Sequence, residues 1–202
     1  LKLAVEGSTG LKVDYYFLVN LEGFKKLIDA MGGVTVNINT QVAVGGNTDA
    51  GIPPDYYLQP GPDQHLTGFK ALWFARGRYG ADDYQRMERQ RCMVDAIVDQ
   101  ANPLNLFRRF GAIAKASKDA VFTDIPQHLL PDLVNLALKV KDKPMRSVVF
   151  TRSTEFDPGN PDFEWVRATV AKAIAHRRHH TGDANHTTTK NKDVCAYTGP
   201  AQ

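Results

Sequence analysis

Cysteine is scarce in this sequence: only Cys92 and Cys195 occur among its 202 residues. So few thiols exclude a disulfide-rich scaffold and a zinc site with four cysteine ligands. The sequence also lacks an internal repeat and any apolar run near the ~18 residues that a membrane-spanning helix needs. What is left is an ordinary globular chain, 43% hydrophobic and 23% charged, long enough to bury about 70% of its unfolded surface.

A strong excess of positive charge is also missing from most of the chain. The formal net charge is +3, but residues 177–202 contain four basic and two acidic residues, which leaves +1 for residues 1–176. A domain that binds duplex nucleic acid spreads a basic stripe over its folded surface. The sequence therefore argues against nucleic acid as a partner, and it predicts that any bound anion is small and locally held.

The first forty residues alternate between strand-like and helix-like patterns. Residues 13–20 are aromatic and β-branched, which predicts a buried strand, and residues 22–31 carry apolar side chains at helical spacing. Gly32 and Gly33 suit the end of that helix, where a left-handed backbone is favoured. Residues 34–38 then alternate β-branched with polar side chains. This strand–helix–strand order predicts a layered domain of the α/β or α+β class.

In the rest of the chain, glycine, proline and capping residues indicate where helices and loops begin and end. Residues 40–64 are rich in glycine and proline, and we expect a long loop there with an edge hairpin. Thr67 is placed to cap a short helix that runs to residue 74. Residues 176–202 are too polar to bury a core, so we predict a folded part at 1–175 and a flexible tail at 176–202. Four further helices are expected at 83–101, 105–118, 127–141 and 162–176, and a buried strand at 147–151.

One short segment is unusually rich in arginine, with five arginines between positions 76 and 91. Arg76 and Arg78 are two residues apart, so an extended backbone points both side chains the same way. Arg86, Arg89 and Gln90 are three and four residues apart, which gathers them on one face of the predicted helix. Two groups of arginines are thus expected near the start of one helix.

The start of that helix has a signal of its own. Asp82 with Gln85 fits a capping box, which places the helix N-terminus just ahead of the arginine face. Helix N-terminal amides favour anions, and planar guanidinium groups match phosphate oxygens two at a time. The pattern therefore predicts a phosphate site, and surface ion pairs with Asp82, Asp83 and Glu88 are the alternative.

The arginine face continues into apolar residues along the same helix. Steps of three or four from Arg86 and Gln90 lead to Met93, Ile97 and Ala101. Such a face suits an amphiphile that has a phosphate head and a hydrocarbon tail. An apolar stripe at helical spacing is more often part of a protein core, and the sequence leaves both interpretations open.

Two stretches around the arginines form a longer pattern. They are Leu66-Thr67-Gly68-Phe69-Lys70-Ala71-Leu72-Trp73-Phe74-Ala75-Arg76-Gly77-Arg78 and Asp83-x-x-Arg86-x-x-Arg89-Gln90. Together with the strand–helix–glycine–strand order of Val13 to Val36, the pattern resembles the LytR-CpsA-Psr family, over residues 1–175. The resemblance implies a layered α-β-α fold in which helices flank a mixed central sheet, with this chain supplying the second half of the domain.

The resemblance also implies an activity and a set of residues for it. Members of this family are phosphotransferases that move a cell-wall glycopolymer from a polyprenyl pyrophosphate carrier to peptidoglycan. By position in the motifs, the catalytic residues are Arg76, Arg78 and Arg86, the pyrophosphate-binding residues are these three with Arg89 and Gln90, the orienting residue is Asp83, and the lipid channel contains Met93 and Ile97.

Other implied features lie outside this sequence. The family uses a magnesium ion, whose aspartate ligands we expect upstream of Leu1, with no metal ligand in this chain. An N-terminal anchor is expected to attach the parent protein to the outer face of the bacterial cell membrane. The partners are then a polyprenyl pyrophosphate-linked glycopolymer and the peptidoglycan acceptor. The alternative function is a non-catalytic, regulatory module of the cell envelope that binds anionic polymer or polyprenyl-phosphate lipid.

The two cysteines lie far apart in the sequence. Cys92 falls inside the arginine-bearing helix, and Cys195 falls in the predicted tail. A location outside the cytoplasm permits a disulfide between them. A free thiol, or a bond to another envelope protein, is equally compatible with the sequence.

Overall fold

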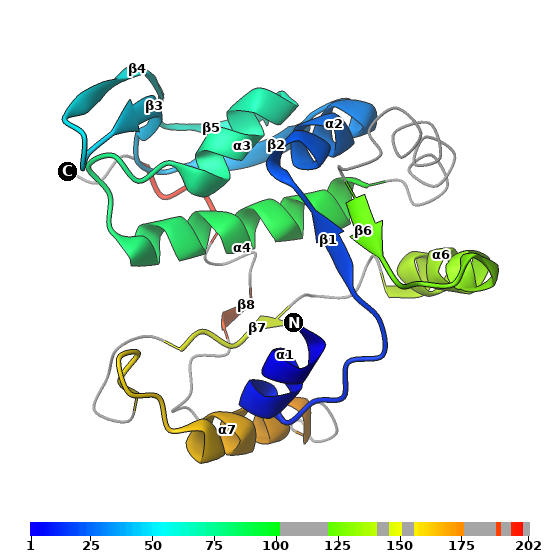
Figure 1. Cartoon of the computed structure of the whole chain (residues 1–202). Coiled ribbons are helices and arrows are strands. Elements are labelled where there is room, and N and C mark those ends of the chain that lie inside the picture. Colours follow the sequence, from blue (N-terminus) through cyan, green and yellow to red (C-terminus); the bar gives the residue numbers. More distant parts are fainter. Residues whose placement is uncertain (102–120, 141–145, 151–155, 176–188, 191–194, 200–202) are drawn as a thin grey trace. The chain divides into compact units, whose positions relative to one another are not determined.

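A computed structural model describes residues 1–101, 121–140, 146–150, 156–175, 189–190 and 195–199 of the chain. The described residues mix helices with antiparallel strands, so the predicted α/β class is confirmed. They divide into two compact units, shown in Figure 1. The first unit combines Leu1–Tyr16 with Arg146–Lys190, and the second combines Phe17–Met145 with Asn191–Gln202.

The first unit is built from two helices and a short strand pair. Helix α1 (Lys2–Thr9) lies against α7 (Phe163–Ala175), and Arg167 Nη1 donates to the Gly7 carbonyl over 2.7 Å. Strand β7 (Arg146–Ser147) pairs antiparallel with β8 (Thr189–Lys190). The helix predicted at 162–176 is confirmed. The strand predicted at 147–151 is wrong in extent, because residues 148–150 form no strand and Phe150 instead packs against the ring of Trp165.

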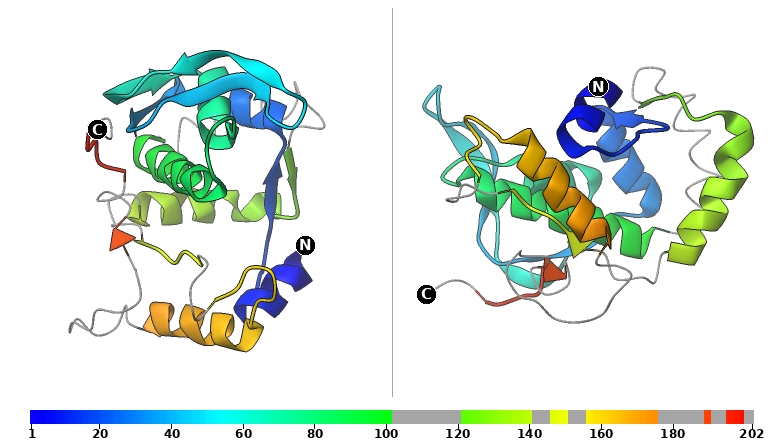
Figure 2. Two further views of the ribbon diagram at one scale, coloured as in Figure 1. Left: turned by 90° about the vertical axis from the view of Figure 1, so that its left-hand side faces the viewer. Right: turned by 90° about the horizontal axis from the view of Figure 1, so that it is seen from below.

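Three antiparallel strand pairs belong to the second unit, and Figure 2 shows them from two further sides. The pairs are β1 (Phe17–Val19) with β6 (Val121–Thr123), β2 (Val34–Ile38) with β5 (Gly61–Leu66), and β3 (Val42–Asn47) with β4 (Ile52–Leu58). The strand predicted at 34–38 is confirmed. The buried strand predicted at 13–20 is shorter and more open than expected, since Phe17 and Leu18 are each 49% exposed.

The loop predicted at 40–64 is wrong, although its hairpin is confirmed. This segment contains three strands, β3, β4 and β5, because each finds a partner along its edge. Gly45 and Gly46 have φ values of +77°, and the β3–β4 register shifts beside them. Glycine at a bulge and proline in an edge strand are both compatible with pairing. Composition therefore indicated irregular backbone where the chain makes bulged strands.

Local signals account for some of the helix ends in the second unit. Its helices are α2 (Leu21–Met31), α3 (Gly68–Arg76), α4 (Asp83–Gln100), the 3₁₀ turn η1 (Gln127–Leu129) and α6 (Leu130–Val140). The helix predicted at 105–118 lies outside the described residues. Gly32 ends α2 with a φ of +92°, as predicted. Thr67 occupies the N-cap position of α3 but makes no capping bond, and Asp29 Oδ1 accepts from Gly68 N over 2.7 Å in its place.

One hydrophobic core joins α2, α3 and α4 with β2, β3, β4 and β5. Helix α3 packs against α2, α4 and β3, while the far end of α4 lies on β2. There the Gln100 amide accepts from Thr35 N over 2.7 Å and donates to Thr35 O over 2.6 Å. Fully burying an aliphatic side chain contributes about 1.5–3 kcal/mol. The buried residues of this core are Ile28, Val34, Val36, Ile38, Val42, Val44, Leu58, Leu66, Ala71, Phe74 and Met93.

The end of the chain is attached to the same core. Cys92 of α4 and Cys195 form a disulfide, which answers the question that the sequence left open. Asn37 Nδ2 donates to the Cys195 carbonyl over 2.9 Å, and Asn39 pairs with Ala196 O and Thr198 N. Residues 195–199 are therefore held against β2. The domain boundary expected at residue 175 stays a prediction, because residues 176–188 lie outside the described ranges.

Candidate functional site

The arginine motifs meet where α3 ends and α4 begins. Helix α3 ends at Arg76, and a turn closed by a 2.9 Å hydrogen bond from Ala81 N to Arg78 O leads to α4. Asp82 Oδ1 accepts from Gln85 N over 2.7 Å, so the predicted cap of α4 is confirmed. We call residues 76–90 the α3–α4 corner. It places the N-terminus of an 18-residue helix beside both groups of arginines.

Gly77 is needed at this corner for its lack of a side chain. A Cβ at this position would lie 2.7 Å from the Ala43 carbonyl of β3 and 2.9 Å from the Trp73 carbonyl. Only glycine allows so close an approach between backbones. The residue between Arg76 and Arg78 is therefore packed tightly onto the sheet.

Asp83 joins the two arginine groups. Its Oδ1 lies 3.1 Å from Arg78 Nη2, and its Oδ2 lies 3.5 Å from Arg86 Nη2. The predicted surface ion pairs are thus present at Asp83, and they draw Arg78 and Arg86 toward one carboxylate. Opposite charges at such exposed positions stabilise the fold only weakly, by about 0–1 kcal/mol. Their main effect here is to bring guanidinium groups from two segments to the same place.

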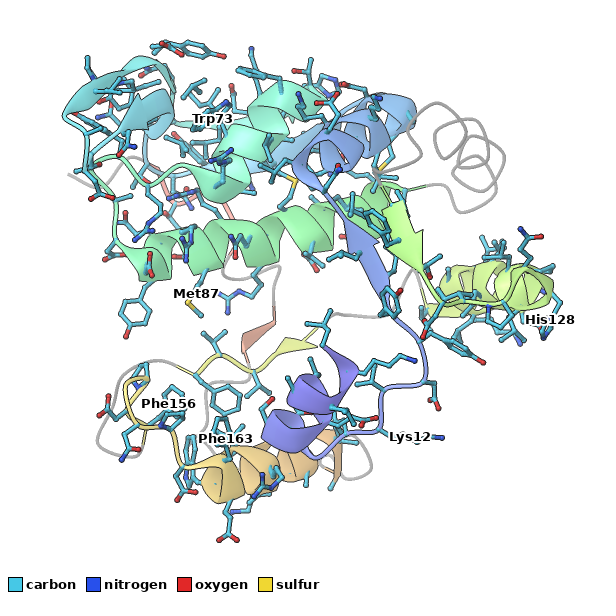
Figure 3. The ribbon with its side chains drawn as sticks, in the orientation of Figure 1. Lys12, Trp73, Met87, His128, Phe156 and Phe163 are labelled. Atoms are coloured by element: carbon cyan, nitrogen blue, oxygen red, sulfur yellow. A yellow bond between two sulfur atoms is a disulfide. The ribbon has the colours of Figure 1, made fainter. Side chains whose placement is uncertain are left out.

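Arg76 is held differently. Its guanidinium carbon lies 4.9 Å from the centre of the Trp73 ring, one helical turn earlier on α3 (Figure 3). A cation over an aromatic face at this distance gains about 0.5–1 kcal/mol at an exposed site. The arginine spacing alone did not predict this contact between Arg76 and Trp73. The spacing of three residues before Arg76 is the signal that identifies it.

Arg89 points inward rather than toward solvent. Its Nε donates to the Phe74 carbonyl over 2.8 Å, and its Nη2 donates to the Gly77 carbonyl. Burial lowers the pKa of this guanidinium from its ordinary value, and the nearby charge of Arg86 lowers it further. Gln90 Nε2 donates to the Ala75 carbonyl over 3.2 Å. One turn of α4 thus supplies donors to the end of α3.

The apolar residues expected to line a lipid channel belong to the core. Met93 is 2% exposed, and Ile97 packs against the core cluster. A second apolar stripe lies on α4 and is exposed. Figure 3 shows one of its members, Met87, on the side of α4 away from α3. The exposed apolar residues of α4 are Tyr84, Met87, Val94 and Val98. A channel at Met93 and Ile97 stays a prediction.

Two further expectations concern metal and membrane. Within the described ranges, no three side chains of His, Cys, Asp or Glu gather as a metal site would require. None of the helices in this part of the chain is long and apolar enough to cross a membrane.

Solved structures share this fold. B. subtilis TagV aligns with 85% of this chain and 68% of its own, at 23% identity and a TM-score of 0.55. A protein of Streptococcus agalactiae aligns with 95% of this chain and 67% of its own, at 20% identity and a TM-score of 0.57. The LytR-Csp2A-Psr enzyme of Actinomyces oris aligns with 84% and 66%, at 13% identity and a TM-score of 0.54. These similarities show the fold.

Sequence relatives carry a functional name. The polyisoprenyl-teichoic acid–peptidoglycan teichoic acid transferase TagU of Halalkalibacterium halodurans is 32% identical over 123 residues, which are 60% of this chain and 38% of that protein. TagU of Bacillus mycoides is 30% identical over 131 residues, 64% of this chain and 40% of its own length. The chain thus matches about two fifths of the length of these curated relatives.

The strongest assignment comes from the family pattern itself. The pattern described as the LytR_cpsA_psr family matches residues 2–175, which include the whole α3–α4 corner and both units' described helices. The match agrees with the arginine spacing, the cap at Asp82 and the fold of the solved relatives. This chain belongs to the LytR-CpsA-Psr family.

Proposed function

We propose that this chain supplies the pyrophosphate-binding part of a phosphotransferase that moves a cell-wall glycopolymer from a polyprenyl pyrophosphate carrier to peptidoglycan. The observation that carries the proposal is the convergence of Arg78 and Arg86 on Asp83 beside the capped start of α4. The TagU relatives, named for transfer of teichoic acid to peptidoglycan, support the class of reaction.

The diphosphate group takes its place beside the exposed guanidinium groups of the corner. Arg76, Arg78 and Arg86 each present planar donors, and such groups bind phosphate oxygens in bidentate fashion. Gln90 adds an amide from the next turn of α4. The side chains of Arg78 and Arg86 are 64% and 28% exposed, so a ligand can reach both. Asp83 orients this pair before the anion arrives.

The same arginines assist the chemistry by positioning and by neutralising charge. A sugar hydroxyl of the peptidoglycan acceptor attacks the phosphorus that carries the glycopolymer, and the polyprenyl phosphate leaves. The phosphoryl group and the leaving group are both anionic, so fixed cations stabilise the transition state. Arg76, Arg78 and Arg86 hold the reacting diphosphate in place and take this role.

The hydrocarbon part of the carrier needs an apolar surface near the diphosphate. The exposed stripe on α4 begins with Tyr84 and Met87, on the same turns as Arg86 and Gln90. It offers that surface without opening the core, whereas a channel along Met93 requires core residues to separate. The exposed stripe is therefore a better candidate than the buried face with Met93 for the surface that receives the hydrocarbon chain.

The disulfide supports a location at the outer face of the cell membrane. Disulfides such as Cys92–Cys195 form and persist outside the reducing cytoplasm. Polyprenyl-linked polymers and peptidoglycan are found in that compartment. The membrane anchor and the magnesium ligands of the parent protein belong to this proposal as expectations for sequence outside this chain.

Binding of a polyprenyl pyrophosphate in detergent micelles tests the proposal. Charge-assisted hydrogen bonds contribute about 1.5–3 kcal/mol each, so Arg76→Gln and Arg86→Gln should each weaken binding roughly tenfold or more. Lys70→Gln is the matched control, because it removes one exposed positive charge from α3 outside the corner. Unchanged affinity in both arginine variants would exclude the site.

Binding together with a transfer assay distinguishes the enzyme from the regulatory alternative. If the proposal is correct, the diphosphate-linked lipid binds best, and the parent protein moves polymer to peptidoglycan in a reconstituted assay. A non-catalytic envelope module binds anionic wall polymer or lipid equally well and transfers nothing in that assay. Polymer transfer by the parent protein that depends on Arg76 and Arg86 would therefore decide for the enzyme.

A further inference from the structure

We infer that Arg89 is a positioning residue, which holds the backbone between Arg76 and Arg78 in place and does not itself bind the diphosphate. The inference rests on the proposed function, because it states how the anion site keeps its shape. In the family motif Arg89 stands between Arg86 and Gln90, and all three side chains carry N–H donors. Its burial together with its backbone contacts separates its role from theirs, since the Gln90 side chain, which also donates to a backbone carbonyl, is exposed.

Two of the three guanidinium nitrogens of Arg89 donate to backbone carbonyls at the end of α3. Nε donates to the Phe74 carbonyl over 2.8 Å, and Nη2 donates to the Gly77 carbonyl. Arg89 is only 8% exposed. A guanidinium covered to this extent offers a ligand little surface, in contrast to the side chains of Arg78 and Arg86. The geometry therefore directs Arg89 at backbone.

Arg89 binds the backbone segment from which Arg76 and Arg78 extend. The last carbonyls of a helix have no partner within the helix, and a cation near them is favourable. Gly77 stands between Arg76 and Arg78, and its other side is packed against the Ala43 carbonyl. Arg89 and β3 thus fix Gly77 from two directions. A shift of Gly77 would move both arginines of the first motif.

The rest of α4 makes this contact rigid. Gln100 binds both backbone groups of Thr35 at the C-terminal end of the helix, and the disulfide joins Cys92 to Cys195 in its middle. Arg89 lies one turn before Cys92. The helix is therefore fixed on its core side. Through Arg89, this fixed helix holds the Phe74 carbonyl of α3 and the Gly77 carbonyl of the corner. Lysine is a poor replacement, because its three donors radiate from one nitrogen and do not reproduce the planar arrangement of the guanidinium.

The test compares two properties in the 202-residue chain. The first is amide hydrogen exchange of residues 77–81 without ligand, and the second is affinity for inorganic pyrophosphate. Arg89→Lys and Arg89→Gln should speed this exchange and weaken binding roughly tenfold or more, since small misplacements of binding groups are costly. Arg86→Lys is the matched variant, and it should weaken binding while leaving exchange in the ligand-free chain unchanged.

Three other results have distinct meanings. Weaker binding with wild-type exchange in the Arg89 variants would make Arg89 a direct ligand and overturn the inference. Faster exchange with wild-type affinity would limit Arg89 to holding the fold and would also overturn it. A wild-type chain that binds no pyrophosphate would overturn the proposed function, and faster exchange in the Arg89 variants would then still support the hold on Gly77. Thermal melts confirm that the compared chains are folded.

Discussion

Asp29 of α2 accepts a 2.7 Å hydrogen bond from the backbone nitrogen of Gly68, the first residue of α3. The helix that carries the first arginine motif is thus capped by a side chain 39 residues earlier rather than by its own N-cap residue. Thr67 occupies that N-cap position without making a capping bond. The start of α3 and the end of α2 are therefore coupled.

Replacing Asp29 and Thr67 one at a time separates their contributions to the free energy of unfolding. Loss of a capping acceptor costs about 0.5–2 kcal/mol, so Asp29→Ala should lower the free energy of unfolding by about 1 kcal/mol. Thr67→Ala should change it by less than about 0.5 kcal/mol, since no capping bond is lost. Urea denaturation measures both values. A larger effect for Thr67→Ala than for Asp29→Ala would contradict this assignment of the cap.

Gly68 also lies close to the backbone of α2, at Lys25. A Cβ at this residue would lie 2.1 Å from the Lys25 carbonyl, and backbone cannot move aside cheaply. We expect Gly68→Ala to destabilise the chain by about 2 kcal/mol or more. Gly7→Ala is the control, because Gly7 lies in α1 with nothing within 4 Å and alanine favours helix. Equal unfolding midpoints for the two variants would contradict the close approach.

Reduction of Cys92–Cys195 should destabilise the chain. The bond joins residues separated by 103 positions, and removing a disulfide costs about 2–5 kcal/mol. Denaturation with and without reductant measures the difference. The double variant Cys92→Ala with Cys195→Ala should resemble the reduced protein and show no response to reductant. A wild-type midpoint that reductant does not move would indicate that the bond contributes nothing.

Asp83→Asn tests whether Asp83 prepares the arginines for an anion. The ion pairs are exposed, so the unfolding free energy should change by less than about 1 kcal/mol. Affinity for inorganic pyrophosphate should fall about three- to tenfold, because Arg78 and Arg86 then lose side-chain freedom on binding. Glu88→Gln removes the same charge from an exposed position of α4 and serves as the control. Tighter binding in Asp83→Asn would show that Asp83 competes with the anion.

Local signals were sufficient for α2 and α4. The apolar spacing of residues 22–31, the glycine at 32 and the cap at Asp82 act within a few residues, and the structure places α2 and α4 accordingly. The strands at 42–66 could not be predicted in this way. Their pairing depends on partners elsewhere in the chain, and glycine with proline indicates irregular backbone whether or not a partner exists.

In the candidate site, too, the features with a local sequence signal were predictable and those that depend on the rest of the chain were not. The spacing of the arginines predicted which segments carry charge, and the pairing at Asp83 agrees with their convergence. Helical spacing groups residues on a face but does not say which side of that face meets the core. Arg89 and Met93 therefore received roles at a ligand surface, whereas their side chains are buried. The cysteine pairing depends on contacts across most of the chain and has no local signal.

The bond at Cys195 reaches beyond the family boundary at residue 175. A protein shortened to that boundary would keep Cys92 as an orphan sulfhydryl and would lose the segment that Asn37 and Asn39 hold. Such a truncation invites mixed disulfides between molecules. The segment that carries Cys195 therefore belongs to the folded part of this chain, although it lies outside the residues that match the family.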